Sequence, residues 1–282
     1  MAYGLLNGKK GIVFGPMDET SLGWSIALAA QSEGADVEIS NIAIATRVGR
    51  VKELAKILGD KEVYVCDASN FEELSETFKK LKEKVGKIDF IIHSVGMSNN
   101  IRKEIPYQDL NYDWYSKTLD VSAMSLHKMI NAALKQDVLN DFASIISLSY
   151  VAAQRVFQTY TDMGDAKALL ESITRSFGAR LGEKKIRVNA VSQSPTPTRA
   201  GTGIEDFDNM FEFTNRVSPL GNATSEECAN YVVTLLSDFT KKVTMQTLFH
   251  DGGYSMMGIT QPMLRLMNEA LKNDEMKKKA GY

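Results

Sequence analysis

The sequence predicts an α/β protein in which one parallel sheet lies between two layers of helices. Short apolar or β-branched runs alternate along the chain with segments of helical spacing. Such alternation buries a parallel sheet on both faces, because right-handed crossovers place a helix against the sheet after each strand. The 282 residues, 44% of them hydrophobic, suffice for one domain with a large core. We therefore expect a single Rossmann-type doubly wound sheet with helices on both faces.

The elements follow each other regularly along the chain. Strands are expected over residues 11–14, 37–39, 63–65, 90–92, 144–146, 186–188 and 244–249. Helices are expected over residues 22–32, 50–58, 71–85, 123–134 and 167–181, and a capping box at Thr224 and Glu227 predicts a further helix start. We expect residues 1–258 to form one domain and the lysine- and methionine-rich residues 259–282 to form a peripheral helix or tail.

Composition argues against several classes of function. A formal charge of −2 and a pI near 6.0 give no basic field to hold a nucleic acid. The apolar runs are much shorter than the roughly 20 residues of a membrane span, and the start of the chain does not resemble a signal peptide, so a cytoplasmic location is expected. Cys66 and Cys228 are too few for a disulfide framework, and no metal is expected because the histidines lack ligand spacing.

The first expected strand runs into a turn suited to a dinucleotide. Gly15, Ser21 and Leu22 lie where the strand passes into the first helix, whose backbone N–H groups can receive a pyrophosphate. The spacing is not G-x-G-x-x-G, so this turn alone is equally consistent with an ordinary strand-to-helix connection.

Two tyrosines and a lysine carry the most informative pattern, Tyr150, Tyr160 and Lys167. If Tyr160 and Lys167 share a helix, seven residues at about 100° each bring both side chains to one face. The spacing Tyr-x9-Tyr-x6-Lys resembles that of the enoyl-acyl-carrier-protein reductases, a family within the short-chain dehydrogenases. The resemblance extends over about residues 5–255 and includes His93-Ser94-Val95-Gly96 and Cys66-Asp67-Ala68, which are similar to the family's His-Ser-Ile-Gly and Cys-Asp-Val.

This resemblance implies reduction of a trans-2-enoyl thioester, the last step of the fatty-acid elongation cycle. Hydride adds to the β-carbon and negative charge gathers on the thioester oxygen, so a hydrogen-bond donor is required there. The resemblance assigns this donor to Tyr160, contact with the nicotinamide ribose to Lys167, and a supporting catalytic role at the substrate pocket to Tyr150.

The same resemblance implies the binding residues. Those for the cofactor are Gly15, Ser21, Leu22, Asn41, Asp67, Ala68, Ser94, Val95, Gly96, Lys167, Pro195, Thr196 and Thr198. Those for the substrate are Met97, Ser98, Tyr150, Tyr160 and Phe207. The segment 193–198 departs from the family's more common Ala-Gly-Pro-Ile-Arg-Thr, which leaves the nicotinamide contacts to backbone groups and the Thr198 hydroxyl.

NADH is the favoured cofactor. No basic residue directly follows the second strand, where a 2′-phosphate would need one, and Asn41 can hydrogen-bond a free ribose hydroxyl. Arg47 and Arg50 leave NADPH open if their loop folds back.

Residues 199–217 carry aromatic and methionine side chains at helical spacing, with Phe207, Met210 and Phe211 on one face. This pattern is interpreted as a mobile helical lid over an acyl chain, the alternative being a fixed helix packed on the core. The expected partner is an acyl-carrier protein, with Arg199 and Arg216 as candidate docking residues. The family further implies a homotetramer.

Two other functions were weighed. A short-chain ketone or 3-oxoacyl reductase has its acid tyrosine four residues before the lysine, but Met163 stands there and a thioether donates no proton. A regulator that binds a dinucleotide without turnover is the second, but binding alone requires neither Tyr150 nor Tyr160.

Overall fold

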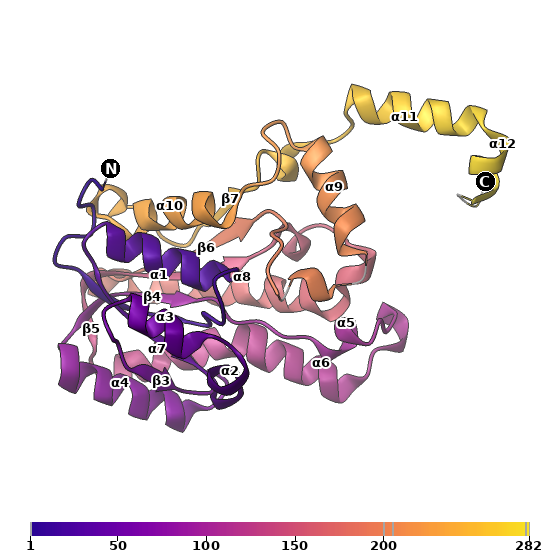
Figure 1. Cartoon of the computed structure of the whole chain (residues 1–282). Helices are drawn as coiled ribbons and strands as arrows, with labels where there is room; N and C mark the ends of the chain where they lie inside the picture. Colours follow the sequence, from indigo (N-terminus) through magenta and orange to yellow (C-terminus); the bar gives the residue numbers. More distant parts are fainter. Residues whose placement is uncertain (1, 200, 205, 280, 282) are drawn as a thin grey trace.

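One seven-stranded parallel sheet forms the centre of the computed structural model, which describes residues 2–199, 201–204, 206–279 and 281 (Figure 1). The strand order is β3-β2-β1-β4-β5-β6-β7, and every neighbouring pair is parallel. The strands are β1 (Lys10–Phe14), β2 (Asp36–Asn41), β3 (Val63–Val65), β4 (Ile88–His93), β5 (Leu139–Ser149), β6 (Arg187–Gln193) and β7 (Thr247–His250). This confirms the predicted doubly wound fold. Because the winding direction changes between β1 and β4, ligands are expected at the carboxyl ends of these two strands.

Helices cover both faces of the sheet. The helices are α1 (Leu22–Ser32), α2 (Ala43–Val48), α3 (Val51–Ile57), α4 (Phe71–Val85), α5 (Asn99–Arg102), α6 (Tyr112–Leu119), α7 (Ser125–Lys135), α8 (Thr161–Leu181), α9 (Phe207–Val217), α10 (Ser225–Leu236), α11 (Gln261–Lys272) and α12 (Asp274–Lys279). One apolar core contains residues of α1, α3 and α10, and a second contains residues of α4, α7 and α8. Successive side chains of β1 alternate between them: Ile12 and Phe14 enter the second core and Val13 the first.

Several boundaries agree with the sequence-based expectation. Helices α1 and α4 cover the predicted ranges 22–32 and 71–85, and α4 begins where the Asn70 side chain accepts hydrogen bonds from the N–H groups of Glu72 and Glu73. The capping box at Thr224 and Glu227 is present at the start of α10. Cys66 and Cys228 are both buried free thiols.

Other boundaries differ. The helix expected over 167–181 begins at Thr161, so Tyr160 precedes α8 in a 3₁₀ turn and does not share the helix with Lys167. The last strand is shorter than the expected 244–249, because Met245 bends into a positive φ of 63° before β7 starts. Helices α2 and α6 were not expected. A π-helical segment, Asp120–Met124, joins α6 to α7 where one helix starting at 123 was expected.

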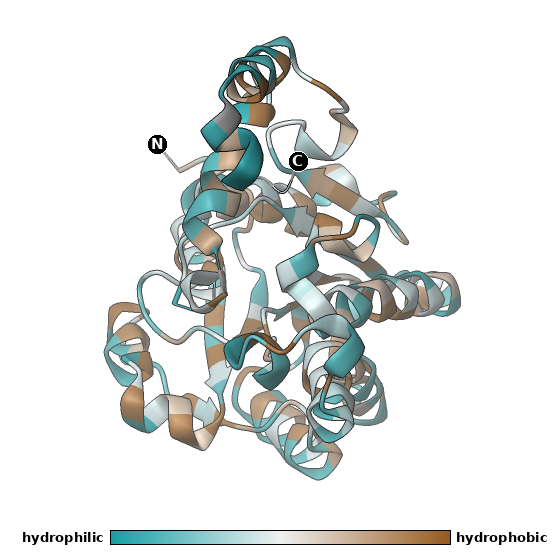
Figure 2. Cartoon of the chain, turned by 90° about the vertical axis from the view of Figure 1, so that its right-hand side faces the viewer, coloured by the Kyte–Doolittle hydropathy of each residue, from teal (hydrophilic) through white to brown (hydrophobic). Residues whose placement is uncertain are grey.

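The C-terminal helices project away from the sheet (Figure 1) and carry both hydrophobic and hydrophilic residues (Figure 2). Leu266 and Met267 on α11 are each about half exposed, and α11 has no buried residue. Ala280 and Tyr282 of the expected tail lie outside the described residues, as does Met1.

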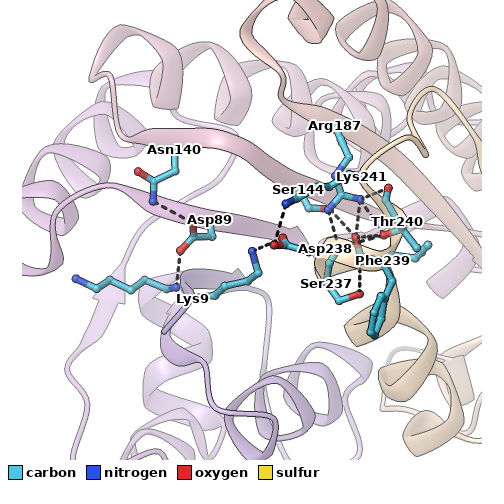
Figure 3. Close-up of polar contacts among 12 residues, drawn as sticks. Lys9, Asp89, Asn140, Ser144, Arg187, Ser237, Asp238, Phe239, Thr240 and Lys241 are labelled. Atoms are coloured by element: carbon cyan, nitrogen blue, oxygen red, sulfur yellow. Dashed lines mark hydrogen bonds and ion pairs between the residues drawn. The ribbon is translucent and has the colours of Figure 1, made fainter. Parts of the chain in front are cut away.

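The amino ends of the strands are joined by a polar network (Figure 3). Arg187 at the start of β6 is 4% exposed. Its Nη1 donates to the carbonyls of Leu235 (2.8 Å) and Thr240 (3.0 Å), and its Nη2 to that of Ser237 (3.4 Å). This cation therefore satisfies carbonyl groups at the end of α10 and in the turn that follows. Nearby, Lys9 forms a more exposed ion pair with Asp238 at 2.9 Å.

We predict that Arg187→Met lowers the free energy of unfolding by about 2 to 4 kcal/mol, because several buried carbonyls lose a charged donor. Lys9→Met is the control and should cost less than about 1 kcal/mol, since its ion pair is exposed to solvent. Urea unfolding followed by circular dichroism measures both. Equal losses in the two variants would show that the buried network does not stabilise the amino end of the sheet.

Candidate active site

The turn from β1 into α1 leaves the helix N-terminus open. Ser21 occupies the N-cap position, but its Oγ accepts from the Met17 N–H (3.2 Å) and donates to the Asp18 carbonyl (2.7 Å), so it does not cap the helix. The first turn, which starts at Leu22, contains no acidic residue. Trp24 and Ser25 donate their N–H groups to the Ser21 carbonyl, whereas those of Leu22 and Gly23 have no partner among the described residues. This end of α1 therefore attracts an anion.

Gly15 allows β1 and β4 to approach each other at this turn. Its φ is 102°, and a Cβ added to it would lie 2.0 Å from the carbonyl oxygen of Ser94. The Gly15 N–H donates to the Ser40 carbonyl at 2.9 Å, and the Ser94 N–H donates to the Phe14 carbonyl at 3.0 Å. Gly15 and Ser94, separated along the chain, therefore lie in contact at the carboxyl edge of the sheet, and only glycine fits.

At the end of β2, the predicted ribose contact, Asn41, uses its amide locally. Its Nδ2 donates to the Pro16 carbonyl (2.9 Å) and its Oδ1 accepts from the Ile42 N–H (2.8 Å). Arg50 forms an ion pair with Glu19 at 2.5 Å, which offsets the charge that a 2′-phosphate would require. Arg47, the other candidate for a 2′-phosphate, is exposed and donates from Nε to the Ala43 carbonyl at 3.4 Å, so the ion pair of Arg50 occupies one of the two arginines.

After β3, Asp67 and Ala68 lie where the resemblance places the adenine. Asp67 Oδ1 accepts from the N–H (2.8 Å) and the hydroxyl (2.7 Å) of Ser69. Within the part of the chain that the structure describes, Oδ2 has no hydrogen-bonding partner, so it is available as an acceptor. Ala68 is 5% exposed and belongs to the core.

The loop after β4 is held against the π-helical segment. Met97 donates its N–H to Ser122 Oγ at 3.0 Å, and Val95 packs against the core. Gly96 is exposed, and a Cβ there would come no closer than 3.8 Å to Ser122 Oγ and 3.9 Å to Met163 Cε. This places an accessible backbone beside Met163.

The predicted catalytic residues come from two adjoining segments. Tyr150 follows β5 directly, and its ring lies 5.1 Å from that of Tyr160 in an edge-to-face contact. Lys167, in the second turn of α8, donates from Nζ to the carbonyl of Leu148 at 2.7 Å. Lys167 is therefore attached to the strand end from which Tyr150 extends. Tyr160 Oη has no hydrogen-bonding partner among the residues described.

Burial sets the charges of these groups. It raises the pKa values of Tyr150 and Tyr160, so both hydroxyls stay protonated at neutral pH. It lowers the pKa of Lys167 to about 8, although the charge of Glu171 acts in the opposite direction. The site thus presents neutral hydroxyl donors together with a buried amine that is protonated below about pH 8.

A buried carboxylate that the sequence analysis did not single out anchors the start of α8. Asp162 is fully buried and accepts from Ser98 Oγ (2.7 Å) and Asn100 Nδ2 (2.8 Å). Ser98, an expected substrate contact, thus directs its hydroxyl to Asp162. These hydrogen bonds connect α5 to α8 immediately after Tyr160. No local pattern could have identified the group, because Asp162 and Ser98 are far apart in the sequence.

The segment after β6 is likewise internally bonded. Pro195 is buried, Thr196 Oγ1 donates to the Ser194 carbonyl at 3.0 Å, and Thr198 Oγ1 accepts from the Gly201 N–H at 3.0 Å. Gln193, where the family more often has alanine, contacts His250 Nδ1 through Oε1 at 2.8 Å. The departure noted in the sequence therefore links β6 to β7.

Helix α9 lies beside the two tyrosines. Phe207 is 6% exposed and its ring is 5.9 Å from that of Phe211. The Met210 sulfur is 3.7 Å from Tyr150 Oη, and Ile204 packs in one apolar cluster with Tyr160. Within the expected range 199–217, residues 200 and 205 lie outside the described residues.

The described ranges lack a metal-binding cluster and a membrane-spanning helix. They contain no group of three histidine, cysteine, aspartate or glutamate side chains placed to hold a metal ion. None of the helices they form has the length and apolar content that a membrane span needs.

The chain is similar to known proteins in both sequence and structure. Residues 15–255 match the family described as Enoyl-(Acyl carrier protein) reductase. The chain is 36% identical to enoyl-[acyl-carrier-protein] reductase [NADH] 1 of Rhizobium meliloti over 92% of its length and 94% of the relative. A crystal structure of the FabI–NADH complex from Alistipes finegoldii is similar, with a TM-score of 0.90, 51% identity and 92% of each chain covered. The Bacillus cereus enoyl-acyl carrier protein reductase, solved with NADP+ and indole naphthyridinone, has a TM-score of 0.85, 31% identity and coverage of 92% of this chain and 100% of that one.

We predict that Gly15→Ala lowers the free energy of unfolding by roughly 3 kcal/mol, because strain at positive φ adds to the clash with Ser94. Gly8→Ala is the matched control. Gly8 also has a positive φ, 77°, but no atom lies within 4 Å of an added Cβ, so about 1 kcal/mol is expected. Guanidinium unfolding of both variants provides the test. A loss at Gly15 no larger than at Gly8 would contradict the close approach of the two strand ends.

Proposed function

The chain belongs to the enoyl-acyl-carrier-protein reductase family, and we propose that its site at the carboxyl edge of the sheet reduces trans-2-enoyl thioesters with NADH, in fatty-acid synthesis. One observation carries the assignment of residues. Tyr160, whose hydroxyl has no hydrogen-bonding partner among the described residues, lies against Tyr150 next to the strand end that holds Lys167. This is the donor and cation arrangement that a developing thioester enolate requires.

The residues present fit a dinucleotide. The uncapped N-terminus of α1 suits the pyrophosphate, and the contact of Gly15 with Ser94 leaves backbone in place of side chains at the strand ends. Asp67 Oδ2 is free to accept from an adenine amino group. The pairing of Arg50 with Glu19 favours NADH over NADPH. When bound, NADH supplies the hydride that adds to the β-carbon of the enoyl thioester.

Tyr160 stabilises the negative charge that gathers on the thioester oxygen. Its raised pKa keeps the hydroxyl protonated, so it donates a hydrogen bond rather than presenting a phenolate. Lys167 has one hydrogen bond fixed on Leu148, which leaves its other two N–H groups for the ribose hydroxyls. Its positive charge also favours the anion. Tyr150 supports Tyr160 by ring contact and borders the acyl site.

We further propose that residues 199–217 form a lid over the acyl chain. Support comes from Met210, which lies next to Tyr150, and Ile204, which packs in one cluster with Tyr160. Phe207 is buried on the same helix as Met210. Excluding water strengthens the hydrogen bond from Tyr160 to the enolate.

The acyl-carrier protein is the partner that the family implies, and its acidic surface calls for a basic docking patch. Arg199 is exposed at the start of the proposed lid, whereas Arg216 forms an ion pair with Glu212 at 2.6 Å. Arg199 is therefore the preferred docking residue. A homotetramer stays a prediction from the family resemblance, and a cytoplasmic location stays a prediction from the sequence.

Ketone reduction is disfavoured by the surroundings of Met163. This residue is 7% exposed and packs with Ile101 and Ala166, where a ketone reductase places its acid. An apolar thioether at that position supplies no proton to an alkoxide.

We predict that Tyr160→Phe lowers kcat for crotonyl thioester by about 10²- to 10³-fold while the NADH dissociation constant stays unchanged, because only the enolate loses a donor. Tyr107→Phe is the control: this tyrosine is exposed and bonds to Asp165, so turnover should be preserved. Initial rates of NADH oxidation measure the effect, with acetoacetyl thioester as the ketone comparison. Wild-type rates in Tyr160→Phe would overturn the assignment of the donor. Turnover of acetoacetyl thioester alone would overturn the reaction class.

A further inference from the structure

Glu171 is a buried carboxylate one helical turn beyond Lys167 on α8. It is 3% exposed. Its Oε1 accepts from Ser149 Oγ at 2.7 Å, and its Oε2 accepts from Gln154 Nε2 at 3.1 Å. A carboxylate out of water is costly unless both oxygens are hydrogen-bonded, and here they are.

The two donors to Glu171 lie on either side of Tyr150. Ser149 is the last residue of β5, and Gln154 follows the 3₁₀ turn Val151–Ala153. Lys167 adds a third hydrogen bond, to the Leu148 carbonyl. The segment 148–154 is thus attached to α8 at three points. Tyr150 is enclosed by these attachments, so its orientation depends on them.

The charge of Glu171 acts on Lys167. Residues four apart on a helix are neighbours on one face, although the two side chains form no ion pair within 4.0 Å. Burial and the charge of Lys167 lower the pKa of His93 to about 3, and burial raises the pKa values of Tyr150 and Tyr160, so these three groups are neutral. The carboxylate of Asp162, five residues before Lys167, is hydrogen-bonded to Ser98 and Asn100 instead. Glu171 is therefore the anion that balances Lys167 in this part of the described chain.

We propose that Glu171 is a positioning residue for the reduction, which fixes the Tyr150 turn against α8 and serves as the counter-charge of Lys167. The proposal rests on the function proposed above. Glu171 acts through other residues, because Ser149 and Gln154 occupy its carboxylate. Loss of the Glu171 carboxylate should alter the pH dependence of NADH binding through Lys167. It should also lower kcat through the Tyr150 turn.

The sign of the pH effect follows from Lys167. Its amine donates to the ribose hydroxyls and favours the anion most strongly when protonated, so NADH affinity should fall as pH rises through about 8. Removing the negative charge of Glu171 takes away the interaction that raises this pKa. In Glu171→Gln the fall in affinity should therefore occur at a lower pH, by roughly one unit, the lower end of what a nearby opposite charge contributes.

The experiment measures the NADH dissociation constant by fluorescence titration for wild type, Glu171→Gln and Glu171→Asp. The titrations run between about pH 6 and 10, roughly the range that spans the protonated and neutral forms of Lys167. Glu171→Asp keeps the charge and should retain the wild-type pH dependence. Glu183→Gln, an exposed position in the turn after α8, is the control for loss of a surface carboxylate and should not differ from wild type. An unshifted curve in Glu171→Gln would overturn the counter-charge role.

A second pair of variants tests positioning without removing the charge. Ser149→Ala and Gln154→Ala each delete one hydrogen bond to Glu171, so kcat for crotonyl thioester should fall several-fold while the pH dependence of NADH binding stays in place. Wild-type kcat in both would overturn the positioning role, even if Glu171→Gln does not fold. Failure of the proposed function is distinguishable, because wild type would then neither bind NADH nor reduce the enoyl thioester.

Discussion

The hydrogen bond from Lys167 Nζ to the Leu148 carbonyl is the contact on which the site depends. It attaches α8 to the carboxyl end of β5, at the edge of the sheet where doubly wound folds bind ligands. A buried amine is tolerated there because this carbonyl and the charge of Glu171 offset part of its desolvation. The same contact places Tyr150 and Tyr160 next to each other, since one follows β5 and the other precedes α8.

Buried polar side chains at the two edges of the sheet hold different parts of the structure in place. At the amino edge, Arg187 satisfies carbonyls at the end of α10 and in the connection that follows. At the carboxyl edge, Asp162 holds the start of α8 and Glu171 holds the Tyr150 turn, both next to the proposed catalytic residues. Among the described residues, the hydroxyl of Tyr160 has no hydrogen-bonding partner. A donor that is already oriented loses little energy in reorganisation when charge develops on the substrate.

The fold was largely predictable from the sequence, because alternating apolar runs determine a parallel sheet and strong caps determine helix starts. Helix α4 is an example, since Asn70 and the acidic residues after it indicate its first turn. The start of α8 was missed because Gly164 weakens a helical pattern, and long-range contacts such as the bonds of Asp162 to α5 stabilise that turn. Tyr150 and Lys167 were recognisable by spacing and resemblance. Glu171 has a local signal, four residues after Lys167, but its role depends on Ser149 and Gln154, which only the folded chain brings near.

The central claim is that hydride reaches the β-carbon of an enoyl thioester while Tyr160 stabilises the charge on the thioester oxygen. The most direct measurement uses NADH carrying deuterium at both C4 positions, with crotonyl thioester, and mass spectrometry of the product. The account predicts butyryl thioester with one deuterium on the β-carbon and none on the α-carbon, because the α-carbon takes its proton from solvent. Deuterium on the α-carbon, or transfer only to the keto carbon of acetoacetyl thioester in a parallel reaction, would contradict it.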